Sequence, residues 1–137
     1  MKAVLLDTGC IVALLDKAER YHQSCRDIVV SLSDSLVTCE AVVSEACFLL
    51  RRVHGARESI LSNVEEGVFQ IPFQLSGHAS AVRRLMEKYR QIPMSLADAC
   101  LVTMADELGT GRILTLDQDF TLYRWGGRRP FDLVITL

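Results

Sequence analysis

Four acidic residues stand at positions that permit one shared site: Asp7, Glu45, Asp98 and Asp117. Asp7 and Asp117 each follow a short apolar run, 3–6 and 113–116, that is typical of a buried β-strand. The carboxyl ends of parallel strands meet at one edge of a sheet, where open α/β folds bind their ligands. The pattern therefore predicts that Asp7 and Asp117 lie at that edge, and it permits all four acids to converge there.

Asp98 is predicted on the core-facing side of a helix that begins after the N-cap Ser95 and ends at Leu108. At ~100° per residue, its nearest neighbours on the helix surface are apolar, whereas Thr103 and Glu107 are predicted on the opposite side. A buried acid is costly unless a cation or a hydrogen bond meets it. Ser95-x-x-Asp98 also fits a capping box, in which the acid bonds back to the cap, and the sequence leaves both interpretations open.

Glu45 and Asp7 also have purely structural alternatives. Glu45 lies off the polar stripe of a helix predicted at 40–53, and an ion pair with Arg52 would explain it equally well. Asp7 has the position of an N-cap for the helical turns predicted at 10–15. Because capping and metal binding are compatible, the second alternative does not remove Asp7 from a shared site.

A cluster of carboxylates favours a hard divalent cation, because the acids repel one another without one. Oxygen ligands without Cys or His favour Mg²⁺ or Mn²⁺ over zinc, and the five cysteines and three histidines have no zinc spacing. Two such ions ~3.5–4 Å apart activate a water and stabilise the leaving oxygen in phosphodiester cleavage. Neither a Ser/His/Asp arrangement nor a Gly-rich phosphate loop competes with this chemistry.

The apolar pattern predicts strands that alternate with helices. Strands are expected at 3–6, 36–38, 68–73, 113–116 and 133–137, and helices at 19–32, 40–53, 57–66, 77–89 and 95–108. A short helix is expected to end at 121–124, followed by a Gly/Arg loop at 125–130. This alternation predicts a single α/β domain, residues 1–137, with a mostly parallel sheet of about five strands between two layers of helices.

Composition excludes several classes of protein. Half of the residues are hydrophobic, which excludes disorder, and 137 residues are enough for one core. No run reaches the ~18 apolar residues of a membrane span, so a soluble cytoplasmic protein is expected. The net charge of −2 excludes a generic polyanion-coating protein, although arginine pairs at 51–52, 83–84 and 128–129 permit local phosphate contacts.

The chain resembles the PIN-domain family, the ribonuclease fold typified by the VapC toxins of bacterial toxin–antitoxin pairs. The resemblance rests on four segments in order: LLDTGCIVALLD at 5–16, VTCEAVVSEACFLLRR at 37–52, MSLADACLVTMADE at 94–107 and ILTLDQDF at 113–120. Each segment alone is a weak motif, but the four in this order are specific. They cover essentially the whole domain.

The resemblance implies an endoribonuclease that depends on Mg²⁺ or Mn²⁺ and cuts RNA. Its catalytic acids would be Asp7, Glu45, Asp98 and Asp117, of which Asp7, Asp98 and Asp117 would hold the metal. Supporting roles fall to Asp119, as a substitute for Asp117, and to Thr8 and Thr115, which would fix the backbone around the site. The resemblance also implies a homodimer and a small antitoxin that inserts near the acidic pocket.

One departure from the family pattern is Gly9, where many PIN domains have Ser or Asn. It affects a polar contact beside the cluster and leaves the four acids in place. The alternative function is a catalytically silent PIN domain that binds RNA or protein. Two other acidic-pocket folds fail: a phosphotransfer receiver needs a lysine after its last strand, and a haloacid-dehalogenase-type phosphatase needs an acid at position 9.

Overall fold

The computed structural model describes residues 2–135 and contains a five-stranded parallel sheet in the order β3-β2-β1-β4-β7. The strands are β1 (Ala3–Leu6), β2 (Ser35–Val37), β3 (Phe69–Gln70), β4 (Arg112–Leu114) and β7 (Asp132–Leu133). The central strand β1 pairs with β2 and with β4, and Leu5 lies opposite Val37 and Ile113. Its residues 4–6 have no exposed surface, as expected of a strand that is covered on both faces.

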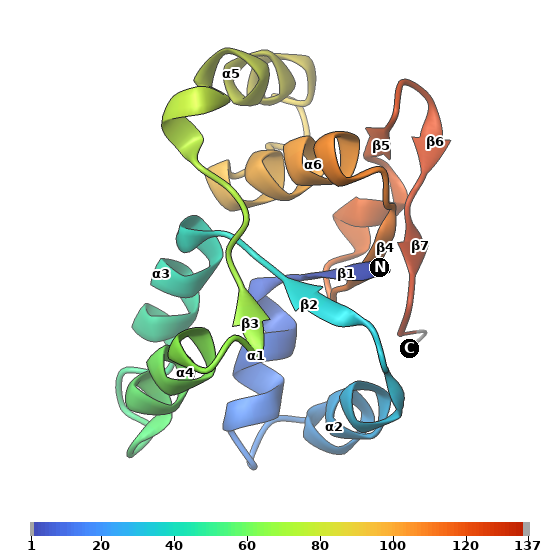
Figure 1. Ribbon diagram of the computed structural model, residues 1–137. Helices are drawn as coiled ribbons and strands as arrows, with labels where there is room; N and C mark the ends of the chain where they lie inside the picture. Colours follow the sequence, from blue (N-terminus) through green and yellow to red (C-terminus); the bar gives the residue numbers. More distant parts are fainter. Residues whose placement is uncertain (1, 136–137) are drawn as a thin grey trace.

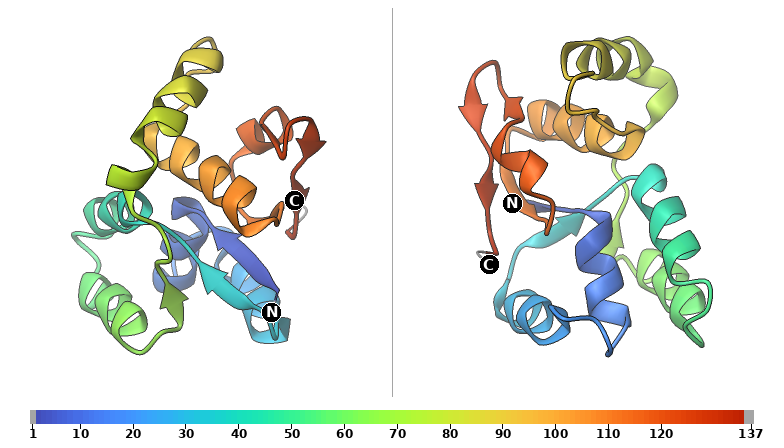
Figure 2. Two further views of the ribbon diagram at one scale, coloured as in Figure 1. Left: turned by 45° about the horizontal axis from the view of Figure 1, so that its top comes forward. Right: turned by 180° about the vertical axis from the view of Figure 1, so that it is seen from behind.

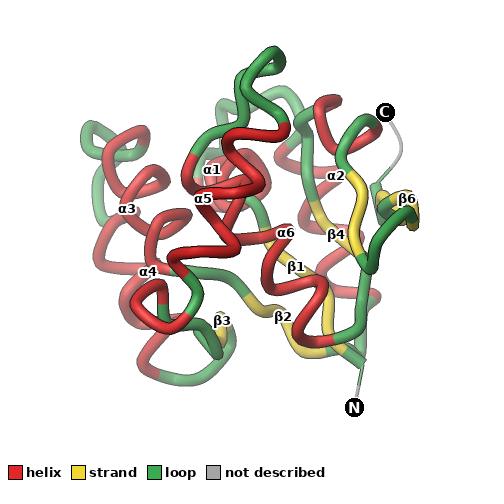
Figure 3. Tube along the Cα trace, turned by 90° about the horizontal axis from the view of Figure 1, so that it is seen from above, coloured by secondary structure: helices red, strands yellow, loops and turns green. Residues whose placement is uncertain are grey.

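Helices form a layer on each face of the sheet (Figure 1). One layer holds α1 (Thr8–Leu15), α2 (His22–Ser31), α3 (Glu40–Leu49) and α4 (Ala56–Glu65), and the other holds α5 (Ala79–Lys88) and α6 (Leu96–Leu108). Figure 2 shows the two layers from two further directions. Seen from above in Figure 3, α5 and α6 lie in front of the strands. The predicted three-layer α/β/α architecture is thus confirmed.

The order of the strands creates a switch point at the centre of the sheet. After β1 the chain adds β2 and then β3 on one side, and it later adds β4 and then β7 on the other side. The direction of winding therefore reverses between β1 and β4. In open α/β sheets the crevice outside the carboxyl ends of the strands at such a point is the usual place for a ligand.

The helix α6 is buried along most of its length because it lies between the sheet and α5. It begins after Ser95, whose hydroxyl accepts a hydrogen bond from the Asp98 N–H at 3.0 Å, and it ends at Gly109, where φ is +68°. All residues from 97 to 105 are buried. The prediction that Thr103 faces away from the core is therefore wrong, since its buried hydroxyl donates to the Ala99 carbonyl at 2.8 Å.

Several element boundaries differ from those expected. The helix expected at 77–89 is divided into a 3₁₀ turn, η1 (Leu75–Gly77), and α5, and the helix expected at 19–32 begins at His22. The expected final strand is present as β7, and residues 136–137 lie outside the described residues. These differences change the lengths of elements but not their order.

The segment 118–130 is the main correction to the sequence analysis. The expected short helix lies earlier, as the 3₁₀ turn η2 (Gln118–Thr121), because the Asp117 carboxylate accepts from the Asp119 N–H at 2.9 Å and begins the turn there. The expected loop at 125–130 contains an antiparallel hairpin of β5 (Arg124–Trp125) and β6 (Arg129–Pro130). Gly126 and Gly127 supply the positive φ values that its turn requires.

Four of the five cysteines belong to the core, as small buried residues. The Cys10 and Cys25 sulfurs lie 3.8 Å apart between α1 and α2, and no disulfide is formed among the five thiols. Within residues 2–135, no helix is long and apolar enough to cross a membrane.

Candidate active site

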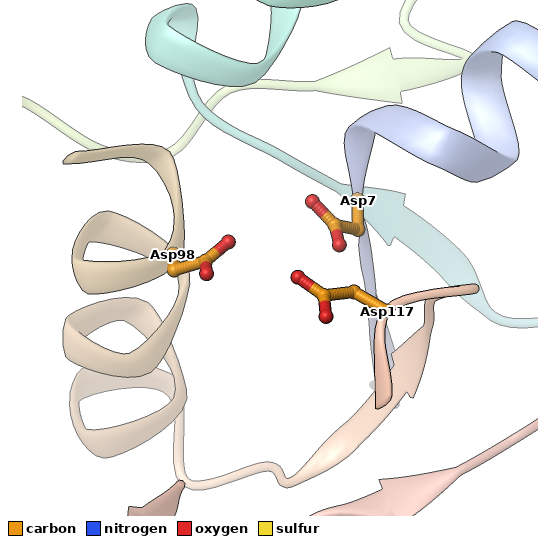
Figure 4. Close-up of side chains that lie close together, drawn as sticks. All are labelled: Asp7, Asp98 and Asp117. Atoms are coloured by element: carbon orange, nitrogen blue, oxygen red, sulfur yellow. The ribbon is translucent and has the colours of Figure 1, made fainter. Parts of the chain in front are cut away.

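Three aspartates converge at the switch point between β1 and β4. One carboxylate oxygen from each of Asp7, Asp98 and Asp117 lies within 4.8 Å of the other two. Asp7 directly follows β1, Asp117 lies in the turn after β4, and Asp98 extends from the first turn of α6. Figure 4 shows that the three side chains point toward one another from these separate elements.

Both carboxylate oxygens of Asp7 are held by neighbouring donors. The Thr8 N–H donates to Oδ1 at 2.7 Å, and the Thr115 hydroxyl donates to Oδ2 at 2.7 Å. Asp7 is thus the N-cap of α1, as the structural alternative suggested, and it is also part of the cluster. The Thr115 hydroxyl accepts from the Asp117 N–H at 3.0 Å, so one side chain links two of the three acids.

Asp98 completes only half of the capping box that its spacing permits. The Ser95 hydroxyl accepts a hydrogen bond from the Asp98 N–H. Within the described residues, the Asp98 carboxylate accepts no hydrogen bond from the Ser95 N–H. Instead, its Oδ2 accepts from the hydroxyl of the fully buried Tyr123 at 3.0 Å. Sequence analysis missed Tyr123, because nothing near residue 123 indicates that its hydroxyl returns to a helix 25 residues earlier.

Glu45 and Asp119 line the same pocket, which has a volume of about 450 Å³, but they do not belong to the group of three. Glu45 is exposed on α3, and within residues 2–135 it makes no ion pair with Arg52. Asp119 is half-buried, and its backbone N–H binds Asp117. The structure thus places two of the predicted acids around the cluster of Asp7, Asp98 and Asp117, of which Asp7 and Asp98 are buried.

Burial raises the pKa of Asp7 and of Asp98, each to about 6. The hydrogen bond from Thr115 opposes this rise at Asp7, while the charges of Asp117 and Glu45 add to it. At Asp98, the charge of Asp7 is the second cause after burial. Burial, followed by the charge of Asp98, also raises the pKa of Glu45. The protein therefore holds several carboxylates in a pocket that disfavours their ionisation.

The donor set of this pocket fits a hard divalent cation. Its described lining includes five carboxylates but no Lys, Arg, His or Cys, so no side chain there offsets the negative charge. Mg²⁺ and Mn²⁺ prefer carboxylate oxygens and keep waters in their remaining positions. Asp7, Asp98 and Asp117 are the side chains that are close enough together to hold such an ion. Their roles as ligands and catalysts stay predictions.

Thr115→Val is expected to raise the pKa of Asp7 further above 6, because it removes a hydroxyl that donates to the Asp7 carboxylate. A hydrogen bond to a charged group contributes ~1.5–3 kcal/mol, which corresponds to an increase of ~1–2 in pKa. A titration of the Asp side chains by ¹³C NMR measures the pKa of Asp7 in the wild type and in the variant. Thr103→Val is the matched control, since this buried hydroxyl binds only the Ala99 carbonyl. An unchanged Asp7 pKa would contradict the assigned role of Thr115.

Two kinds of comparison connect this geometry with known proteins. The sequence profile of the PIN domain matches residues 4–126. Ribonuclease VapC26 of Mycobacterium tuberculosis is 29% identical over 117 residues, which span 84% of this chain and 87% of that protein. The crystal structure of M. tuberculosis VapC20, a sarcin–ricin loop cleaving toxin, matches with a TM-score of 0.81 over 93% of this chain and 99% of that chain. The 19% identity between these two chains establishes a shared fold.

Proposed function

This chain belongs to the PIN-domain family, and on that premise we propose that it is a metal-dependent endoribonuclease of the VapC-like toxin kind. The observation that carries the proposal is the cluster of the buried Asp7 and Asp98 with the half-buried Asp117 at the switch point of the sheet, with no cationic side chain in the described lining. The name of the relative VapC26, a ribonuclease, supports RNA as the substrate. The proposed reaction is hydrolysis of a phosphodiester bond.

In this proposal Asp7, Asp98 and Asp117 hold Mg²⁺, or Mn²⁺ in its place. An ion held there would offset the negative charge of the three carboxylates and would favour deprotonation of the attacking water. Thr115 and the Thr8 N–H fix the Asp7 carboxylate, and Tyr123 fixes that of Asp98, so both acids are oriented before substrate arrives.

Glu45 has a different role from the three clustered aspartates, because it is an exposed residue of the pocket lining. We assign to it the acceptance of a proton from the attacking water. Attack at phosphorus breaks the bond to the 3′ oxygen, which takes up a proton from solvent, and leaves a 5′-phosphate and a 3′-hydroxyl. Asp119, whose backbone binds the Asp117 carboxylate, keeps the turn after β4 in place.

Family membership extends the proposal to the partners of the protein. We expect a homodimer, a cognate antitoxin that covers the acidic pocket and a cytoplasmic location. Sedimentation of the purified chain measures the first of these, and co-purification from the native host measures the second. A chain that is monomeric at all concentrations would contradict the expected dimer but would leave the proposed reaction unaffected.

Cleavage of a mixed-sequence single-stranded RNA by the purified protein tests the proposed activity. We expect cutting in Mg²⁺ or Mn²⁺, none in EDTA, and 5′-phosphate ends on the products. Asp7→Asn is expected to reduce the rate by more than ~100-fold, since loss of a mere supporting contact at a metal site already costs ~10–100-fold. Folded protein that binds RNA and cuts none of it in either metal would favour the silent binding module.

A further inference from the structure

An apolar hollow lies beside the acidic pocket, between α3 and the first turn of α6. It has a volume of about 500 Å³ and is lined by Ala41, Ser44, Glu45, Phe48, Leu49, Leu96 and Ala97. Two of these residues, Glu45 and Leu49, also line the acidic pocket. Leu96 and Ala97 directly precede Asp98 in the chain. The hollow is therefore continuous with the proposed catalytic site.

The hollow presents an aromatic ring that is largely accessible. Phe48 is 62% exposed, and Leu49 and Leu96 beside it are 55% and 41% exposed. The Arg51 guanidinium lies over the Phe48 ring at 4.1 Å from its centroid, and Arg51 also donates to the Phe48 carbonyl at 2.8 Å. An aromatic ring supported by a guanidinium is a surface on which a flat, electron-rich group stacks.

Unpaired positive charge follows the ring at the end of the same helix. The corner between α3 and α4, which we call the arginine corner, forms a hollow lined by residues 51–55, 57 and 58, and its cations are Arg51, Arg52 and Arg57. In the part of the chain that the structure describes, none of these three makes an ion pair, whereas Arg83 binds Glu87 and Arg112 binds Asp34. Their charge is therefore available to phosphates.

We propose that α3 is the path of single-stranded RNA away from the catalytic site. A base next to the cleaved phosphodiester stacks on Phe48 in the apolar hollow, and the following phosphates contact Arg52 and Arg57 at the arginine corner. The inference rests on the proposed ribonuclease function and adds to it the path along which the RNA strand binds. An unpaired strand can splay a base onto a protein ring without the cost of breaking a base pair.

The charges favour RNA over a second copy of the chain as the occupant of this face. A two-fold dimer over α3 would set the apolar hollows of both copies against each other, and such a contact does not require the arginines at the end of the helix. RNA offers both an apolar face for Phe48 and an anion for the arginines. Along α3 the acidic pocket, the aromatic ring and the arginine corner follow one another. They match, in the same order, the metal-bound phosphate, the neighbouring base and the further phosphates of the strand.

Binding of RNA to variants in an Asp7→Asn background tests the role of Phe48 without cleavage. The probe is a fluorescein-labelled single-stranded 12-mer of mixed sequence. Phe48→Ala is expected to weaken its binding by ~5- to 100-fold, the range for loss of one base–aromatic stack, and Phe48→Tyr is expected to retain it. Leu61→Ala is the matched control, because Leu61 is 57% exposed on α4 and lies outside the hollow. Equal affinity for Phe48→Ala and its parent would overturn the proposal.

A duplex of the same sequence separates stacking from general electrostatic attraction. Its bases are already stacked on one another, so Phe48→Ala is expected to leave its affinity unchanged. An equal loss for both probes would mean that the substitution damages the protein surface generally, and the stacking role would be wrong.

The salt dependence of binding tests the arginine corner. Replacement of Arg52 and Arg57 by Ala is expected to reduce the slope of log K against log salt by ~1.4, the effect of two lost phosphate contacts on a single strand. The double variant Arg83→Ala, Arg84→Ala on α5 is the matched control and is expected to keep the slope. If only the α5 variant changes the slope, the strand follows α5 and the proposed path is wrong.

Three further results separate this inference from the proposed function and from a dimer contact. If the parent enzyme cuts RNA and the Phe48→Ala enzyme cuts with unchanged KM and kcat, the path is wrong and the nuclease stands. If the parent neither binds nor cuts RNA in Mg²⁺ or Mn²⁺, both fail. If Phe48→Ala converts a dimer into a monomer, as measured by sedimentation, and leaves RNA affinity per chain unchanged, the hollow is instead an interface between copies.

Discussion

Asp98→Asn is expected to abolish RNA cleavage and, in the absence of metal, to make the protein more stable. Loss of activity by more than ~100-fold follows from the loss of a proposed ligand of the metal. Stability is expected to rise because Asp98 is ionised at neutral pH although burial and the charge of Asp7 raise its pKa to about 6. A carboxyl whose pKa rises from 3.8 to about 6 costs the folded state about 3 kcal/mol above that pH.

Chemical denaturation in EDTA at pH 7.5 measures the stability half of this prediction, and RNA cleavage in Mg²⁺ measures the other half. The amide oxygen of Asn retains an acceptor for the Tyr123 hydroxyl, so the hydrogen bond need not be lost. Asp132→Asn, on the exposed strand residue Asp132, controls for the change in net charge alone and is expected to alter neither property. A large loss of stability in Asp98→Asn would show that Asp98 serves α6 rather than the site.

The sequence predicts those parts of the site that depend on local patterns. Asp7 and Asp117 stand at the ends of apolar runs, and parallel strands necessarily bring such ends to one edge. Asp98 stands near the start of a helix with an evident N-cap, Ser95, which fixes its place in the first turn. These positions follow from strand and helix periodicity and from the rule for parallel sheets. The same rule brings Asp7 and Asp117 to one edge, whereas for Asp98, on a helix, the sequence only permits the convergence that the structure shows.

The contacts that fix the acids depend on tertiary packing and leave no local pattern. The Thr115 hydroxyl reaches an acid 108 residues away in sequence, and Tyr123 reaches one 25 residues away. The prediction that Thr103 faces away from the core is wrong for the same reason. The periodicity of α6 cannot show that α5 covers the other side of this helix. The exposure of Glu45 also depends on tertiary packing, because its place on the helix permits either a buried or an exposed carboxylate.

Metal-free protein is expected to lose stability as the pH rises from about 4 to about 7, through the titration of Asp7 and Asp98. Burial is the chief cause that raises both pKa values to about 6, above the ordinary value of 3.8. A group with a raised pKa in the folded state contributes its stability below its unfolded pKa and loses it as the pH rises through the folded pKa. The two acids repel each other, so they titrate as a coupled pair over this range.

Other groups also titrate between pH 4 and pH 7, so the informative quantity is the difference between the wild type and the double variant Asp7→Asn, Asp98→Asn. The melting temperature of each, in EDTA and in millimolar Mg²⁺, measures it. In EDTA the melting temperature of the wild type is expected to lie at least ~9 °C below that of the variant at pH 7, at ~3 °C for each kcal/mol, and to match it near pH 4. A difference that does not change with pH would contradict the raised pKa values.

Mg²⁺ is expected to reverse this loss only where the carboxylates are ionised. Below pH 5 protons occupy Asp7 and Asp98 and compete with the metal, so the melting temperature of the wild type should not respond to Mg²⁺ there. Above pH 6 the ion binds the folded state selectively and raises its stability with concentration, by ~2.7 kcal/mol at 100 times the dissociation constant. The double variant lacks two of the three proposed ligands and should not respond at either pH. Equal responses of wild type and variant would place the bound ion elsewhere on the protein.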